Sequence, residues 1–337
     1  MTLLYLTDPR FLDHDTGRGH PERPARLGAV AQGIDAAGLR EAIVPAEPRR
    51  ATRDDLERVH PGAFVDAIER FCSAGGGAID PDTHAGPGSF EAALLAAGAG
   101  LEAIDRLDRG EADAAFCAVR PPGHHATSTR AMGFCLFNNV AVCAAALAAR
   151  GERVAIVDYD VHHGNGTQAV FWKRPDVLYV SFHEWPLYPG TGGLREVGEA
   201  AGHGTTINLP LPAGATGDVY RDAADRVVLP ALADFGATWL LVSAGFDAHR
   251  ADPLSGMGLS AGDFADLTGD LLGAVAPGRR ILHLEGGYDL DSLALSCGAA
   301  MAVAAGERFR PEAPTSGGPG GDVVAGALKV RTVAADG

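Results

Sequence analysis

Short apolar runs rich in β-branched residues alternate along the chain with longer alanine-rich segments. The apolar runs predict strands at Leu3–Leu6, Ala114–Val119, Val154–Val161, Val177–Phe182, Thr205–Leu209, Leu240–Ala244 and Ile281–Leu284. The alanine-rich segments predict helices, among them Phe90–Leu107, Asn139–Ala149, Val219–Ala233 and Ala261–Ala274. This alternation favours an α/β fold with a mainly parallel central sheet that is flanked by helices on both faces.

The last part of the chain differs from the rest in composition. Residues Ala313–Asp322 read APTSGGPGGD, a Gly/Pro/Ser-rich stretch that is typical of a flexible segment. No internal repeat and no long polar linker precede Glu307. We therefore expect one domain over residues 1–312 and a Gly/Pro-rich C-terminal tail over residues 313–337, whose last residues pack only loosely.

Composition narrows the class of protein. The 337 residues are 46% hydrophobic and 21% charged, which is typical of a soluble globular protein with a large core. No apolar run is long enough to cross a membrane, and the first residues, MTLLYLTDPRF, do not resemble a signal peptide. Five scattered cysteines without a Cys-x-x-Cys pair favour reduced thiols in the cytoplasm. The net charge of −15 argues against nucleic-acid binding, and the oligomeric state stays open, a homo-oligomer included.

Four polar motifs follow directly on predicted strands. They read RPPGHH, DYDVHHGNG, SAGFDAH and LEGGY. The carboxyl ends of parallel strands lie at the same edge of a sheet, and ligands bind at that edge. We therefore expect the four motifs to converge on one crevice, which chance placement does not readily explain.

The second motif places Asp158, Asp160 and His162 at alternate positions, so that an extended strand would point all three to one face. Such crowding is costly unless a cation lies between the side chains. Asp160 and His162, together with Asp247 of the third motif, provide the carboxylate and imidazole ligands of a catalytic zinc site. A lone aspartate at a strand end is as often a helix N-cap. Asp158 could orient an imidazole or help to hold a second cation.

The other two motifs supply groups for acid–base chemistry. His124 and His125 follow a stiff Pro-Pro-Gly turn, and a neutral histidine beside a metal-activated water is a suitable general base. Tyr288 follows two glycines and could donate a hydrogen bond to a developing oxyanion. Taken alone, the histidines could be surface loop residues and the tyrosine could pack in a turn. Together they indicate attack of water on a polarised carbonyl, and hydrolysis of an amide is the best candidate.

The motifs occur in the order known from one family. RPPGHHA, GFCLFNN, DYDVHHGNGT, YPGTG, INLPLPAG, SAGFDAHRADPL and LEGGYD resemble the histone deacetylases and their bacterial relatives, from His20 to about Ala305. HGNG and LEGGYD are similar to the class II branch. The resemblance implies a single-domain arginase/deacetylase-like fold with an eight-stranded sheet, and a deacetylase catalytic domain over residues 1–312.

The resemblance also implies two cations at this edge of the sheet. One Zn²⁺ per chain would be bound by Asp160, His162 and Asp247, and whether iron occupies the site in the cell stays open. A structural K⁺ or Na⁺ would lie beside it. The side-chain or backbone oxygens that match its ligands belong to Asp158, Asp160, His162, Ser181 and Phe182.

The catalytic roles follow from the same resemblance. His125 would act as general base and then as general acid, and His124 would assist electrostatically while hydrogen-bonded to Asp158. Asn165 would stand behind His125, where class I relatives have an aspartate. Tyr288 would stabilise the tetrahedral intermediate together with zinc. A tyrosine at this position matters because relatives with histidine there are poor deacetylases.

A narrow substrate tunnel is implied as well. Its two walls would be aromatic, with a hydroxyl on the side where Tyr188 replaces the phenylalanine of many relatives. A slot of this kind encloses an aliphatic chain of the lysine type. The residues expected to bind substrate are Gly133, Phe134, Tyr188, Leu254 at the rim, Gly286, and Asp82 at the mouth, with Asp80 competing for the last role.

The substrate stays open among several classes. Relatives that prefer acetylated polyamines carry a glutamate where this chain has Gly256, which favours an acylated lysine peptide or protein, or another acylated primary amine. An acetylpolyamine amidohydrolase is the first alternative. An arginase-like manganese ureohydrolase is more distant, because its Asp-Ala-His-x-Asp run is absent. A non-catalytic reader of acyl-lysine is disfavoured by the retained histidines and tyrosine.

Overall fold

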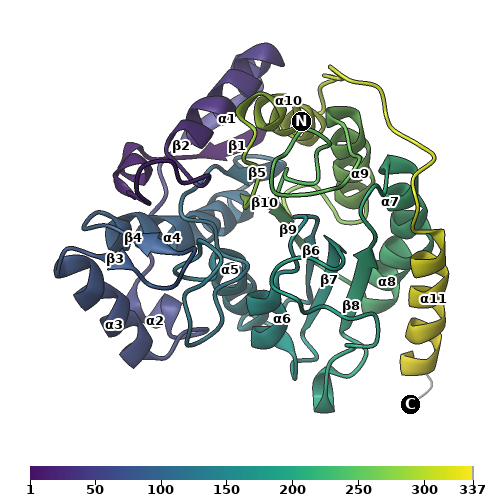
Figure 1. Ribbon diagram of the computed structural model, residues 1–337, viewed down its shortest axis with the longest axis horizontal. Coiled ribbons are helices and arrows are strands. Elements are labelled where there is room, and N and C mark those ends of the chain that lie inside the picture. The colour runs from purple at the N-terminus through teal and green to yellow at the C-terminus, as the bar shows by residue number, and fades with distance from the viewer. Residues whose placement is uncertain (336–337) are drawn as a thin grey trace.

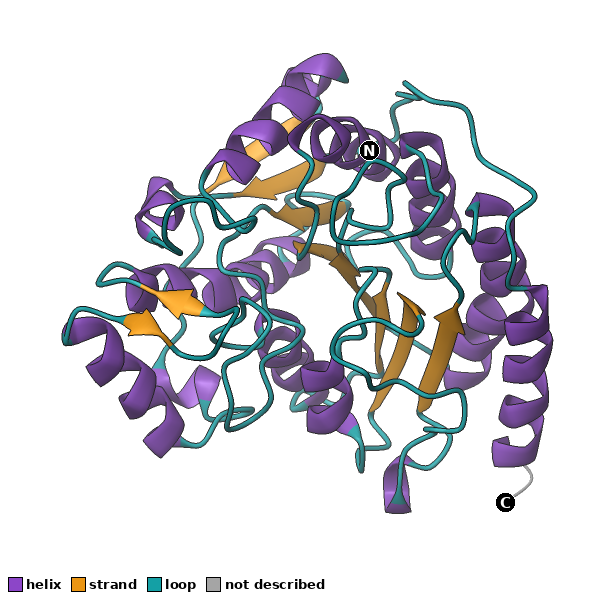
Figure 2. Cartoon of the chain, in the orientation of Figure 1, coloured by secondary structure: helices purple, strands orange, loops and turns teal. Residues whose placement is uncertain are grey.

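A computed structural model describes residues 1–335, and an eight-stranded sheet runs through this part of the chain (Figures 1 and 2). The strand order is β2-β1-β5-β10-β9-β6-β7-β8, and neighbouring strands pair in parallel. The predicted parallel α/β architecture is thereby confirmed. The strands are β1 (Leu3–Leu6), β2 (Ile43–Ala46), β5 (Ala114–Cys117), β6 (Val154–Asp158), β7 (Val177–Glu184), β8 (Thr206–Leu211), β9 (Trp239–Ala244) and β10 (Arg280–Leu284).

Two features of the strands differ from the prediction. Strand β6 ends at Asp158, so Asp160 and His162 lie in the loop that follows and not at strand positions. Strand β2 and the small antiparallel hairpin of β3 (Gly77–Ala78) and β4 (His84–Ala85) were not predicted. Strand β2 is short, half-buried and contains Pro45, which is tolerated there because β2 lies at an edge of the sheet.

Helices flank the sheet on both sides (Figure 1). Helix α10 packs between α1 and α9 in one group, and α4 packs against α5 in the other. The predicted helix over residues 219–233 is divided by a π-helical turn at Ala224–Val228, just before Pro230, which has no N–H to donate to the preceding turn. The helices are α1 (Ala25–Ala36), α2 (Arg53–Leu56), α3 (Gly62–Ser73), α4 (Ser89–Asp108), α5 (Asn139–Ala148), α6 (Asn165–Phe171), α7 (Gly217–Ala223), α8 (Leu229–Phe235), α9 (Ala261–Gly273), α10 (Leu290–Ala304) and α11 (Gly321–Ala335).

Up to residue 335 the expected loose packing at the end of the chain is wrong, and residues 336–337 of the expected tail lie outside the described residues. Residues 321–335 form helix α11, which lies along β8, the strand at the other edge of the sheet (Figure 1). Its Val324 and Ala327, one turn apart, are buried. The segment before it is also held, because the backbone N–H and the hydroxyl of Thr315 both donate to Asp263. Composition identified a change in the chain but missed this short apolar stripe.

The cysteines and the helices agree with the expectations from composition. All five cysteines are buried and free within the described residues, as expected from their scattered positions. Between residues 1 and 335 the structure has no helix with the length and apolar character needed to span a membrane.

The centre of the sheet carries the four polar motifs. Strands β5, β10, β9 and β6, which carry the four polar motifs, are consecutive neighbours at its centre.

Candidate metal and catalytic site

The carboxyl ends of the four central strands deliver the motif side chains to one place. His125 follows β5, His162 follows β6 and Tyr288 follows β10, and all three line a single cavity. Asp247 follows β9 and contacts His162. Each of these strands is fully buried, so the polar side chains begin where the apolar run ends. The predicted convergence on one crevice is therefore confirmed.

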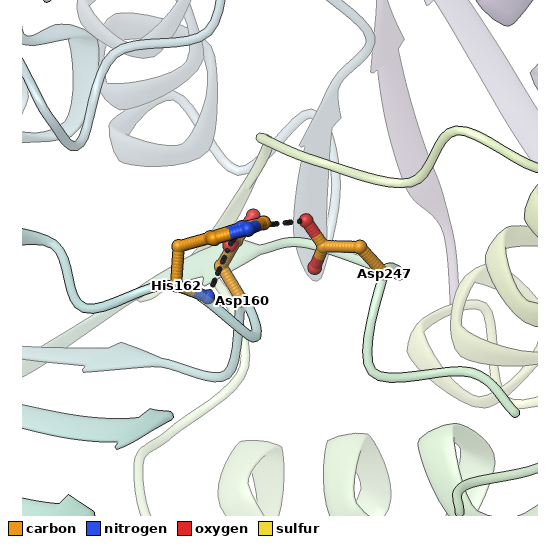
Figure 3. A group of neighbouring side chains, drawn as sticks. All are labelled: Asp160, His162 and Asp247. Carbon is orange, nitrogen blue, oxygen red and sulfur yellow. Dashed lines mark hydrogen bonds and ion pairs between the residues drawn. The ribbon is translucent and has the colours of Figure 1, made fainter. Parts of the chain in front are cut away.

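Asp160, His162 and Asp247 form a compact set of metal-ligating groups (Figure 3). One ligand atom of each lies within 4.8 Å of the others, and Nδ1 of His162 is 3.2 Å from Oδ1 of Asp160 and 3.2 Å from Oδ2 of Asp247. The remaining oxygens accept backbone hydrogen bonds, from Gly286 to Asp160 at 2.8 Å and from Val161 to Asp247 at 3.0 Å. The backbone thus fixes both carboxylates and leaves one oxygen of each facing the imidazole.

The charges in this set call for a cation. All three side chains are largely or fully buried, and two carboxylates share one imidazole. Burial and the neighbouring Asp160 raise the pKa of Asp247. Burial lowers the pKa of His162, but the two carboxylates outweigh burial and raise the value to about 10. A divalent ion would neutralise the excess negative charge, and two carboxylate oxygens with one imidazole nitrogen are ligands that suit zinc. The residues present therefore fit the implied metal.

The two histidines after β5 have different partners and opposite pKa shifts. Nδ1 of His124 donates to Oδ2 of Asp158 at 3.0 Å, whereas Nδ1 of His125 donates to Oδ1 of Asn165 at 2.8 Å. Burial lowers the pKa of His124, but Asp158 and Asp160 outweigh it and raise the value to about 10. Burial and the neighbouring His124 lower the pKa of His125 well below its ordinary value. These opposite shifts favour a neutral imidazole at His125 and a protonated one at His124.

Among the residues expected to hold a monovalent cation, Asp158, Asp160 and Ser181 are neighbours. Asp158 and Ser181 are partners in the register of β6 and β7. Oδ2 of Asp158 also accepts from the Tyr179 hydroxyl at 3.1 Å, and its Oδ1 accepts from the N–H of Asp160. The Ser181 hydroxyl is 3.0 Å from Nδ1 of His183. The structure places these oxygen donors side by side, and the monovalent ion stays a prediction.

Tyr288 stands on a loop that is tied to the core through its backbone. Nε of Arg26 donates to the Gly287 carbonyl at 2.7 Å, Nη2 donates to the Glu285 carbonyl at 2.5 Å, and the guanidinium lies 5.0 Å from the centre of the Tyr288 ring. Arg26 is fully buried and pairs with Glu22, which lies four residues earlier, before helix α1 begins. The sequence analysis did not single out either residue, although both lie in His20–Leu27, which reads HPERPARL and begins the region of family resemblance.

Glu285 is a further buried carboxylate that sequence reasoning did not single out. Its Oε2 accepts from the N–H groups of Gly123 at 2.6 Å and of His124 at 3.2 Å. Burial raises its pKa to about 7, against the lowering effect of His124. Its backbone carbonyl accepts from Arg26, as described above. Glu285 therefore fixes the loop of the two histidines to the loop of Tyr288.

Most of the residues expected to form the substrate tunnel line a cavity of about 270 Å³, which His162 of the metal-ligating set also lines. The rings of Phe134 and Tyr288 lie edge to face with centres 5.7 Å apart, and the ring of Tyr188 is 5.1 Å from that of His125. Gly133 adopts φ +57°, and a Cβ there would lie 2.3 Å from Cδ2 of His125. The lining residues are Asp82, His125, Gly133, Phe134, His162, Leu187, Tyr188, Leu254 and Tyr288.

Two of the residues expected to bind substrate, Asp82 and Gly286, differ in their relation to the cavity. Asp82 lines the cavity, whereas Oδ1 of Asp80 accepts from the N–H groups of Asp82 and Thr83 inside the turn, so the structure favours Asp82 of the two candidates. Gly286 does not line the cavity as expected; it lies against the carboxylates, where a Cβ would be 2.0 Å from Oδ2 of Asp247. Absence of a side chain at Gly286 thus serves the metal-ligating set.

Comparison with known proteins gives consistent matches. The family model described as the histone deacetylase domain matches residues 20–304 of this chain. A histone deacetylase-like amidohydrolase of Pseudomonas aeruginosa is 41% identical over 84% of this chain and 76% of its own length. A probable deacetylase of Archaeoglobus fulgidus is 39% identical over 83% and 80%, and histone deacetylase 15 of Arabidopsis thaliana is 40% identical over 93% and 58%. The crystal structure of the HDA15 HD domain matches with a TM-score of 0.90 and 36% identity, over 99% of this chain and 97% of that one.

Proposed function

This chain belongs to the histone deacetylase family, and we propose that it is a zinc-dependent amidohydrolase that removes acetyl or other acyl groups from lysine-type amines. One observation carries the proposal. His162, which belongs to the ligand set of two carboxylates and an imidazole, lines the same cavity as His125 and Tyr288. A metal site, a neutral base and a hydroxyl donor in one cavity are the parts that hydrolysis of an amide requires.

The side chains divide the reaction between them. When bound, the zinc ion would supply Lewis-acid activation of the water and of the acyl carbonyl. His125 takes the proton of the attacking water at Nε2, because Asn165 already accepts the hydrogen bond of its Nδ1, and later returns a proton to the leaving amine. Tyr288 donates its phenolic hydrogen to the oxygen on which negative charge develops. The protonated His124 adds positive charge beside the base.

The cavity suits the side chain of an acylated lysine. Phe134 and Tyr188 give it aromatic walls, which enclose an aliphatic chain without offering it a charge partner. Asp82 at the mouth can accept hydrogen bonds from the N–H groups of a peptide backbone. An acylated lysine within a peptide satisfies both features, and this supports acyl-lysine as the substrate class.

One observation favours the acetylpolyamine alternative. Asp82 lines the cavity and could equally pair with an ammonium group, and the carboxylate of Glu184, outside the cavity lining, accepts from the N–H of Gly256 at 2.7 Å. Gly256, the position at which polyamine-preferring relatives carry a glutamate, therefore has the carboxylate of Glu184 next to it. A cationic substrate would find negative charge at the mouth, although Glu184 is largely buried.

The proposal is tested by comparing kcat/KM on an acetyl-lysine peptide, on acetylputrescine and on acetylspermidine, with metal analysis of the same sample. We expect one zinc ion per chain and faster turnover of the peptide, with Tyr288→Phe as the control of strongly reduced activity. A strong preference for the polyamines would replace acyl-lysine by the alternative substrate class. Two transition-metal ions per chain, with hydrolysis of a guanidine substrate, would instead favour the manganese ureohydrolase.

A further inference from the structure

A buried carboxylate that no motif role accounts for connects the rim of the cavity to the loop of Tyr288. Asp252 lies between β9 and α9 and is 4% exposed. Its Oδ2 accepts from the N–H of Tyr288 at 2.6 Å and from the N–H of Asp289 at 3.2 Å. Its Oδ1 accepts from the N–H of Leu254 at 3.0 Å. One side chain therefore holds the backbone on both sides of the cavity.

The loop of Tyr288 needs such a connection. Gly286 and Gly287 precede the tyrosine, and Gly287 adopts φ +117°, a region that side-chain-bearing residues rarely occupy. Two consecutive glycines have no side chains that could hold the loop by packing. Arg26 fixes the loop through its carbonyl groups, and Asp252 fixes it through its N–H groups. The position of the phenol thus depends on two buried side chains, one that binds the carbonyl groups of the loop and one that binds its N–H groups.

We propose that Asp252 is the positioning residue that sets both the hydroxyl donor Tyr288 and the rim residue Leu254 for deacylation. The inference rests on the proposed function, because it concerns how that reaction is supported. Asp252 itself does not contact the reacting atoms. Its effect on turnover passes through Tyr288, and its effect on substrate binding passes through Leu254. These two effects can be separated, because each carboxylate oxygen serves a different side of the cavity.

Two substitutions separate the effects. An asparagine at this position has one oxygen, so its amide must place an NH₂ group against an N–H on one side. It keeps more hydrogen bonds by turning its oxygen towards Tyr288 and Asp289, and it then loses the bond to Leu254. Asp252→Asn should therefore loosen the rim alone. Asp252→Ala removes all the acceptors and leaves buried N–H groups without partners on both sides.

The test measures kcat and KM on an acetyl-lysine peptide for both variants, in the wild-type and in the Tyr288→Phe background. We expect Asp252→Ala to lower kcat by roughly tenfold or more, since small displacements of a catalytic group cost up to about a hundredfold. In the Tyr288→Phe background the same substitution should change kcat by less than about threefold, because the hydroxyl that it positions is gone. Asp252→Asn should raise KM and keep kcat within about threefold of the wild type.

A matched control distinguishes positioning from general stability. Asp263 is also a buried carboxylate that accepts several N–H groups, but it lies at the start of α9 and holds Ser260 and Thr315. Asp263→Asn should lower the melting temperature without a change in kcat, and circular dichroism and zinc content are measured for every variant. If Asp252→Ala does not fold, the split between KM and kcat in Asp252→Asn decides the question.

The outcomes that overturn the inference differ from those that overturn the proposed function. An equal loss of kcat from Asp252→Ala in both backgrounds would mean that the residue does not act through Tyr288. A loss of kcat in Asp252→Asn without a rise in KM would also contradict the inference. In either case the wild-type enzyme remains an active deacylase. Absence of turnover on every acylated amine by the zinc-loaded wild type would overturn the proposed function, and this inference with it.

Discussion

Replacement of Glu22 by glutamine should destabilise the fold by about 3 kcal/mol. Glu22 lies between two guanidinium groups, and all three side chains are fully buried. Its Oε1 and Oε2 accept from Arg120 at 2.5 and 2.7 Å, and Oε1 is 3.3 Å from Nη1 of Arg26. Removal of the carboxylate charge leaves two buried cations facing each other, an arrangement that is strongly destabilising.

The magnitude follows from the pKa of the carboxyl group. Burial alone would raise the pKa of Glu22, but Arg120 and the other neighbouring positive charges outweigh burial and lower it from 4.5 to about 2. That difference corresponds to about 3 kcal/mol of folding free energy. Because the pKa is lower in the folded state, this contribution is complete above pH 4.5 and is lost as the pH falls towards 2. Glutamine removes it at every pH.

The assay compares thermal and urea unfolding of the wild type, Glu22→Gln and a matched control. In the control, Asp35→Asn breaks the ion pair with Arg40, whose side chains are 51% and 76% exposed, and this should cost less than about 1 kcal/mol. The difference between wild type and Glu22→Gln should shrink as the pH falls below 4.5. A variant as stable as Asp35→Asn, or a difference that does not change with pH, would refute the reasoning.

Three further predictions concern the site. His125→Ala and Tyr288→Phe should each lower kcat/KM by about two orders of magnitude while the circular dichroism spectrum stays unchanged, and normal turnover in either variant would contradict the assigned roles. Removal of the metal by a chelator should abolish turnover and lower the melting temperature, and added zinc should restore both. Gly133→Ala should lower kcat by roughly tenfold or more, because its Cβ would displace the ring of His125; an unchanged kcat in the folded variant would show that the ring can shift at no cost.

The sequence predicted the centre of the sheet well and its edges poorly. Central strands such as β6 and β9 are buried on both faces and read as uninterrupted apolar runs, and the polar residues that follow them mark the ligand-binding edge. Strand β2 was not predicted because an edge strand can be short and can contain a proline, so its sequence lacks the long apolar run of a central strand. The end of β6 was misplaced because alternation of Asp158, Asp160 and His162 resembles a strand, although the loop folds back on the carboxylates.

Buried charged residues are the part of the site that the sequence concealed. Glu22, Arg26 and Asp252 are of residue types that usually lie at the surface. The sequence around each of them does not indicate that it is buried. Glu22 and Arg120 are 98 residues apart, and the N–H of Tyr288 meets Asp252 across 36 positions. Such partners are brought together by the fold alone. The candidate ligands and catalytic groups could be recognised because motifs place them at strand ends, whereas the groups that hold them have no motif of their own.

Helix α11 also affects how the protein behaves in contact with copies of itself. It packs beside β8, which is paired with β7 on its other side and forms one of the two edges of the sheet. At the opposite edge, β2 carries Pro45, which cannot donate a hydrogen bond to an added strand. An exposed parallel edge recruits further strands from other molecules. A chain shortened to end before Gly321 would therefore keep its catalytic residues and gain a tendency to polymerise through β8.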